Sequence, residues 1–181
     1  MRKDSYGLLF IRGLSAGLAG IIFITYVFQS SSGFSVFSIS NPLNSNAFFY
    51  LFVVGPSEEM IFRFFVPLVI MVFADTSYIV GGIAGGIMFG FAHYWAYGGN
   101  TLDLITAIVA GMWLSIIVWQ FSMKKEGKFT FMPGLLAAML AHGLYDYLVT
   151  TMPGMMLIIG AAMAMILLAS YVIPKVEEDL E

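Results

Sequence analysis

The sequence predicts an all-α protein, a polytopic transmembrane bundle of about six helices. The composition is 60% hydrophobic with only 10% charged residues, and the mean hydropathy is +0.90, far from the balance of a soluble domain. The apolar residues occur in long runs and not in short alternating segments, which favours helices over a transmembrane barrel. Helices also satisfy their own backbone hydrogen bonds, as the interior of a bilayer requires.

A run of about 17 to 25 apolar residues is long enough to cross a bilayer as a helix. The expected spans are Tyr6 to Phe28, Ala47 to Phe73, Tyr78 to Tyr97, Leu102 to Met123, Met132 to Val149 and Met155 to Ile173. The second span is the least regular, because it contains Pro56 and Pro67. Its stretch Gly55-Pro56-Ser57 predicts either a kink in one helix or the end of a half-helix and a new helix capped by Ser57.

Residues 1–181 are expected to form a single transmembrane domain. The connections are short, the longest running from Gln29 to Asn46, and no composition shift suggests a second domain. We expect the first apolar run to be a retained helix and not a cleaved signal peptide. The chain has no cysteine, which excludes disulfides, thiol catalysis and zinc-thiolate or iron-sulfur sites. The net charge of −3 makes nucleic acid an unexpected partner.

The basic residues predict the orientation of the chain in the membrane. Those outside the spans are Arg2, Lys3, Lys124, Lys125, Lys128 and Lys175. The alternation of six spans places all of them on one side, which the positive-inside rule makes cytoplasmic. The sequence therefore predicts a multi-pass protein of the cell membrane, with both termini and the loop from Lys124 to Lys128 in the cytoplasm.

Several ionisable residues lie inside the spans, where a charge at the bilayer centre costs about 2.5 to 3.5 kcal/mol. Arg12 is near a span end and is expected to extend to the cytoplasmic surface. Glu59 and Arg63 are four residues apart in Glu58-Glu59-x-x-x-Arg63, so a helix places them on one face as a structural ion pair. Glu58 is turned by about 100 degrees from Glu59 and remains available for another role.

The other intramembrane polar residues are His93 in the third span and His142-x-x-x-Asp146 in the fifth. Gly82, Gly86 and Gly90 precede His93 at four-residue spacing, which predicts close contact with another helix and directs His93 toward the bundle interior. Three helices can thus bring polar groups to one buried point. A single intramembrane histidine is often only a packing hydrogen bond, but the combination is improbable as packing alone.

The motifs Glu58-Glu59-x-x-x-Arg63, Phe89-x-x-x-His93 and His142-x-x-x-Asp146, each on its own span, resemble those of the CPBP family of intramembrane proteases. This family, also called Abi, includes the CAAX prenyl endopeptidases of the Rce1 type and bacteriocin-processing proteins, and the resemblance covers roughly Val54 to Val149. It implies a peptidase without metal or cofactor that cleaves a peptide or membrane-protein substrate. By motif position, Glu58 and His93 would activate a water, His142 and Asp146 would stabilise the oxyanion, and Glu59 with Arg63 would brace the helix.

Asp146 departs from the pattern, because CAAX-processing members often have Asn at this position. An ionised Asp cannot donate a hydrogen bond. Asp146 is therefore either protonated, or it holds His142 as a charged donor. The chain is also short for a prenyl-protein processing member, so another peptide or membrane protein is the more expected substrate.

Three alternatives remain open at this level. Two histidines with Glu58 and Asp146 could ligate a divalent ion in a metal-dependent membrane hydrolase, although no His-Glu-x-x-His helix is present. A non-catalytic scaffold or a subunit of a membrane complex could retain the protease fold. A proton-coupled carrier is the least favoured, because the ionisable groups cluster instead of forming a path across the bilayer. The predicted orientation adds that His93 lies toward the outer leaflet.

Overall fold

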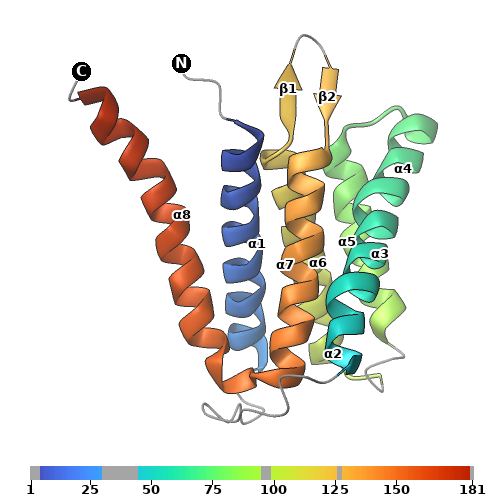
Figure 1. Cartoon of the computed structure of the whole chain (residues 1–181). Helices are drawn as coiled ribbons and strands as arrows, with labels where there is room; N and C mark the ends of the chain where they lie inside the picture. Colours follow the sequence, from blue (N-terminus) through green and yellow to red (C-terminus); the bar gives the residue numbers. More distant parts are fainter. Residues whose placement is uncertain (1–4, 30–44, 95–98, 126–127, 180–181) are drawn as a thin grey trace.

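The computed structural model describes residues 5–29, 45–94, 99–125 and 128–179. Within this part of the chain, six helical rods stand side by side and a short β-hairpin projects from one end of the bundle (Figure 1). The predicted all-α bundle of a membrane protein is thus confirmed. The elements are α1 (Tyr6–Gln29), α2 (Ser45–Phe49), η2 (Tyr50–Val54), α3 (Gly55–Glu59), η3 (Met60–Phe65), α4 (Val66–Ala74), α5 (Tyr78–Tyr94), α6 (Thr101–Gln120), β1 (Met123–Lys125), β2 (Lys128–Thr130), α7 (Met132–Thr151), η4 (Pro153–Met155) and α8 (Met156–Asp179).

The second rod runs without a break from α2 to α4 and contains two π-helical segments, η2 and η3. Each π segment ends just before a proline-containing turn, Pro56 in α3 and Pro67 in α4. Of the two alternatives predicted for Gly55-Pro56-Ser57, the new helix capped by Ser57 is wrong, because the Ser57 hydroxyl donates to the carbonyls of Val53 (2.6 Å) and Val54 (3.0 Å). The chain widens by π turns around the prolines and continues, and Glu58 and Glu59 lie within a continuous helix.

Pro67 shows how the rod tolerates its prolines. A proline has no backbone N–H, so the carbonyl four residues earlier, that of Arg63, loses its usual donor. The hydroxyl of Tyr78, a buried residue at the start of α5, donates to this carbonyl at 2.9 Å. A side chain of the next helix thus replaces the missing backbone bond and ties α5 to the second rod.

Helix α5 packs closely on both sides through its glycines. A Cβ added to Gly86 would lie 2.6 Å from the backbone nitrogen of Met112 in α6, and one added to Gly82 would lie 2.9 Å from the Ser115 Cβ. On the other side, a Cβ on Gly81 would lie 2.8 Å from the Cα of Pro67. The predicted contact of the glycine stripe with another helix is confirmed, and this contact fixes the position of His93 at the end of α5.

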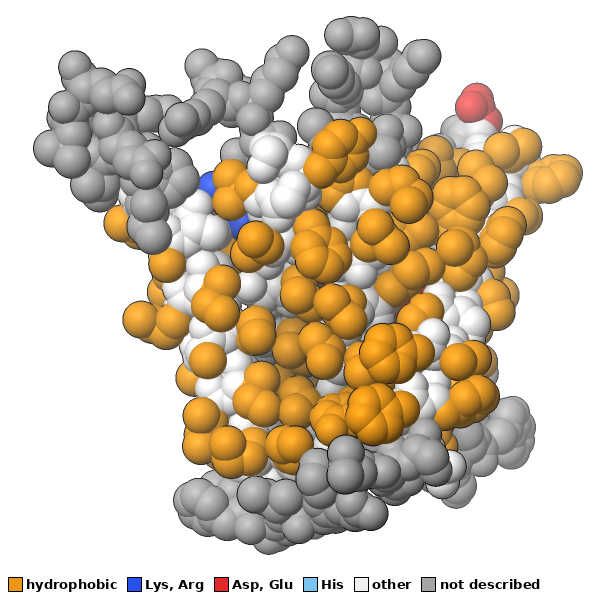
Figure 2. Space-filling view, in the orientation of Figure 1, with side chains coloured by type: hydrophobic (Ala, Val, Ile, Leu, Met, Phe, Trp, Pro, Cys, Tyr) orange, Lys and Arg blue, Asp and Glu red, His pale blue; other side chains and the backbone are white. Residues whose placement is uncertain are grey.

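The core lies between α1, α6 and α7, and its buried members include Leu18, Ile21, Leu114, Val118 and Ala141. By contrast, the outer surface carries large apolar side chains, and the face in Figure 2 is dominated by them. Those more than half exposed include Phe23, Phe52, Val72, Phe73, Met165 and Leu168. Three helices in the described residues are long and apolar enough to cross a membrane on their own, at Tyr6–Phe28, Thr101–Gln120 and Pro153–Val172. This apolar exterior is the surface of a membrane protein.

The structure corrects the prediction for the connection around Lys124, and some other predictions fall on residues that it does not describe. The segment around Lys124 is an antiparallel hairpin and not a loop, with Met123 paired to Thr130 and Lys125 to Lys128. The predicted connection from Gln29 to Asn46, the end of the third span at Tyr97 and the basic residues Arg2 and Lys3 lie mostly or wholly outside the described residues.

Arg12 does not extend to the surface, so this prediction is wrong. The residue is only 6% exposed. Its Nη2 donates to the backbone carbonyl of Ser170 in α8 at 2.7 Å, and its Nε donates to the Ser170 hydroxyl at 3.3 Å. The guanidinium also lies over the ring of Tyr171, 4.0 Å from its centroid. α8 therefore offers Arg12 partners inside the bundle, and the residue joins α8 to α1.

We expect Arg12→Ala to weaken the attachment of α8, because charge-assisted hydrogen bonds contribute about 1.5 to 3 kcal/mol each. The melting temperature of the detergent-purified protein should fall. Ser170→Ala is the matched control and should have a smaller effect, because the backbone acceptor remains. Equal melting of Arg12→Ala and the unmodified protein would show that this contact does not hold α8.

Candidate active site

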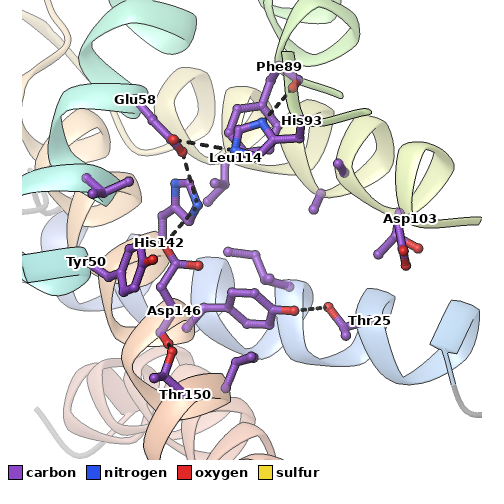
Figure 3. Close-up of a pocket in the computed structure, with 17 residues that line it drawn as sticks. Thr25, Tyr50, Glu58, Phe89, His93, Asp103, Leu114, His142, Asp146 and Thr150 are labelled. Carbon is purple, nitrogen blue, oxygen red and sulfur yellow. Dashed lines mark hydrogen bonds and ion pairs between the residues drawn. The ribbon is translucent and has the colours of Figure 1, made fainter. Parts of the chain in front are cut away.

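The ionisable residues singled out in the sequence line a partly open cavity of about 600 Å³ between α1, the second rod, α5, α6 and α7. Glu58, His93, His142 and Asp146 all border it and point toward one another (Figure 3). Its other lining residues include Thr25, Tyr50, Asp103, Thr106, Tyr145 and Thr150. Four predicted site residues from three helices therefore share one cavity.

Glu58 lies between the two histidines. Its Oε1 is 3.4 Å from Nε2 of His93, and its Oε2 is 3.8 Å from Nε2 of His142. The Glu58 side chain is 24% exposed, against 16% for His93 and 9% for His142. Both carboxylate oxygens thus face an imidazole while the group keeps contact with the cavity.

His93 is oriented from behind by its own helix. Its Nδ1 lies 2.8 Å from the carbonyl oxygen of Phe89, one turn earlier in α5. A carbonyl only accepts hydrogen bonds, so Nδ1 carries a hydrogen and Nε2 is directed at Glu58. The ring of Phe89 stacks at a tilt on His93 at 4.2 Å and meets the edge of His142 at 5.4 Å. The Phe89 ring therefore packs against both imidazoles and limits their orientation.

Glu59 holds two partners and not one. Its Oε2 lies 3.2 Å from Nε of Arg63, the pair predicted from their spacing. Its Oε1 lies 2.9 Å from Nδ1 of His142, a contact between α3 and α7 that the sequence did not reveal. Glu59 and Arg63 are both fully buried. The carboxylate therefore orients His142 by Nδ1 and leaves its Nε2 directed at Glu58.

The buried guanidinium of Arg63 is held by packing and by the charge of Glu59, and not by hydrogen bonds within the described part of the chain. Its guanidinium lies 4.7 Å from the ring centroid of Phe89, a cation-π contact. Its Nε and the Glu59 carboxylate are within ion-pair range but are not aligned for a hydrogen bond, and Nη1 and Nη2 have no hydrogen-bond partner among the described residues. Because an unpaired buried charge is expensive, the Glu59 charge is what makes this position tolerable.

Asp146 approaches His142 from the cavity side. Its Oδ2 lies 3.6 Å from Nε2 of His142, the nitrogen that also faces Glu58. Asp146 therefore does not occupy the far side of the ring, which belongs to Glu59. Tyr145 of α7 accepts a hydrogen bond from Thr25 of α1 at 2.9 Å and supports the neighbouring wall (Figure 3).

Sequence reasoning missed Phe89, Thr25, Tyr145 and Asp103 as parts of this site. For Phe89 a signal existed, because it is one turn before His93 in the same motif. No comparable signal marks the other three residues. In the described part of the chain, no group of three His, Asp or Glu side chains is arranged to hold a metal ion.

The model of one protein family, the type II CAAX prenyl endopeptidase Rce1-like family, matches residues 40–148. The match spans more than half of the chain and includes Glu58, His93, His142 and Asp146. The chain belongs to the Rce1-like family. The protein is therefore an intramembrane protease of the general CAAX type, and the resemblance noted from its motifs is confirmed. No curated protein and no solved structure matches the chain.

We expect Glu59→Gln to destabilise this Rce1-like protein by about 3 to 5 kcal/mol, because it leaves the buried Arg63 without a counter-charge. Melting in detergent measures the loss. Glu58→Gln is the matched control, an identical change at the neighbouring, partly exposed position, and should melt close to the unmodified protein. If the two variants melted alike, Glu59 would not be the residue that holds the site together.

Proposed function

We propose that this protein is a glutamate-type intramembrane endopeptidase that hydrolyses a peptide bond of a membrane-associated substrate. The observation that supports it most is the position of Glu58, which faces Nε2 of both His93 and His142 at the wall of a cavity. The Rce1-like family supplies the reaction class. The residues of the cavity supply the roles.

In this proposal Glu58 and His93 activate the attacking water. A carboxylate and an imidazole are both competent general bases when placed within reach of the same proton. His93 Nδ1 is engaged by the Phe89 carbonyl, so the proton is received on the side of Nε2 and Glu58. The proton then passes to the amine that leaves when the peptide bond breaks.

His142 stabilises the oxyanion of the tetrahedral intermediate. It donates from Nδ1 to Glu59, so donation from Nε2 as well requires the imidazolium form. Glu58, Glu59 and Asp146 surround the ring and stabilise that positive charge. The Asp146 carboxylate lies within ion-pair range of Nε2 and faces it until the oxyanion takes its place. A preorganised charged donor of this kind is among the strongest sources of rate enhancement.

The membrane arrangement belongs to the same proposal. The six rods cross the membrane of the cell as a multi-pass bundle, and the substrate is a peptide or protein anchored in that bilayer. The chain acts without a metal or organic cofactor. A scaffold that keeps the fold without cleaving predicts no requirement for Glu58, whereas a metal-dependent hydrolase predicts loss of activity with a chelator.

We expect Glu58→Gln to abolish cleavage while the protein stays folded, because the amide cannot accept a proton from water. Comparison of membrane peptidomes from cells with each form measures this and identifies the substrate. Asp75→Asn is the matched control, the same acid-to-amide change at an exposed residue that ends α4. Unchanged cleavage products in the Glu58→Gln cells would overturn the mechanism, and sensitivity to a chelator would favour the metal alternative.

For the oxyanion we expect His142→Ala to lower kcat about 100- to 1000-fold. Asp146→Asn should retain most of the activity, because an amide accepts from His142 and also donates to an oxyanion. Asp146→Ala lacks both functions and should lose activity. Rates with a cleaved peptide from the peptidome test this, and an inactive Asp146→Asn beside an active Asp146→Ala would contradict the assignment.

A further inference from the structure

The cavity lies in one half of the bundle along the helix axes. In α1, α5 and α7 its lining residues lie in the second half of the helix, and in the second rod they lie in the first half. In α6 they lie in the first half except for Leu114. Because neighbouring rods run in opposite directions, all these halves face the same end of the molecule (Figure 1).

That end is the one where α1 ends, α2 begins, α5 is followed by α6, and α7 turns into α8 (Figure 1). Polar side chains line the cavity toward it. Asp103 is in the first turn of α6, and Thr150 and Thr25 lie near the ends of α7 and α1. The lining of the cavity is therefore polar on the side nearest this end of the bundle.

The basic residues of the connections lie at the opposite end. The hairpin, which carries Lys124, Lys125 and Lys128 in its two strands, projects there, and the last turns of α8 with Lys175 reach the same end (Figure 1). At the cavity end, the sequence of the connecting stretches 30–44, 95–100 and 152–155 contains no Lys or Arg. Among these segments, every Lys and Arg therefore lies at the end opposite the cavity.

Lys and Arg in short connections are retained on the cytoplasmic side. We propose that the cavity opens to the non-cytoplasmic side of the membrane, so that its substrate is a membrane-anchored peptide or protein presented on that face. The cytoplasmic end is closed by the packed halves of α1, α6 and α7 that lie away from the cavity, where Ala16, Ile117, Phe121 and Leu135 are buried. The identity of the occupant rests on the proposed peptidase function, but the direction of the opening does not.

Because the chain has no native cysteine, single-cysteine variants report the direction directly. Thr150→Cys places a thiol at the cavity wall, and Thr130→Cys places one in β2 at the opposite end. A membrane-impermeant maleimide is added to intact cells, and to the same cells after permeabilisation. We expect Thr150→Cys to be labelled in intact cells, and Thr130→Cys to be labelled only after permeabilisation.

The reverse pattern overturns the inference, as does labelling of Thr150→Cys only after permeabilisation. The same labelling in a Glu58→Gln background separates this result from catalysis, since the direction of the cavity is independent of Glu58. If the inactive variant shows the expected pattern while the active form yields no cleavage products, the orientation stands and the peptidase function fails. If cleavage occurs but Thr130→Cys alone is labelled in intact cells, the peptidase function stands and the proposed orientation fails.

Discussion

The site depends on the contacts of one buried carboxylate, that of Glu59, with Arg63 and His142. One oxygen faces Arg63 on the same rod, and the other meets Nδ1 of His142 on α7. Removing charged groups from water is costly, and it is compensated only when the partners remain together. The packing of α7 against the second rod, the orientation of His142 and the burial of Arg63 are therefore one arrangement and not three.

Glu58 and Glu59 are neighbours with opposite surroundings. Glu59 is enclosed, whereas Glu58 faces the cavity between two imidazoles. The π segments on either side of this turn alter the usual helical register, a feature that often accompanies functional sites. The chain also needs close approach here, because a Cβ on Gly55 would lie 2.8 Å from the backbone of Gly143. This contact brings the second rod near enough to α7 for Glu59 to reach His142.

Much of this arrangement follows from the sequence, since composition and apolar runs predict the bundle, and helical spacing predicts the Glu59–Arg63 pair. The glycine stripe on α5 predicts its contact with another helix. What failed depended on tertiary partners. The predicted surface position of Arg12 is wrong because nothing in the local sequence indicates that Ser170 and Tyr171 are its partners. The Glu59–His142 bond joins residues 83 positions apart, and such a distance carries no periodic signal.

The prolines illustrate the same limit. Pro56 correctly indicated an irregular helix, but a cap at Ser57 and a π turn start from the same residues. Whether the helix ends or continues through a π turn depends on which groups donate to the carbonyls that lose their backbone partner at the proline. For the Arg63 carbonyl, four residues before Pro67, the donor is the Tyr78 hydroxyl on the following helix. Local patterns locate such a defect, and the packing around it decides its form.

The division of labour between the two glutamates is tested most directly by ¹⁵N NMR of the histidine side chains. The chain contains only two histidines, so both can be assigned. We expect Glu59→Gln to shift the Nδ1 resonance of His142 and to leave His93 nearly unchanged, whereas Glu58→Gln should shift the Nε2 resonances of both histidines. An unchanged Nδ1 resonance of His142 in a folded Glu59→Gln variant would show that Glu59 does not orient His142.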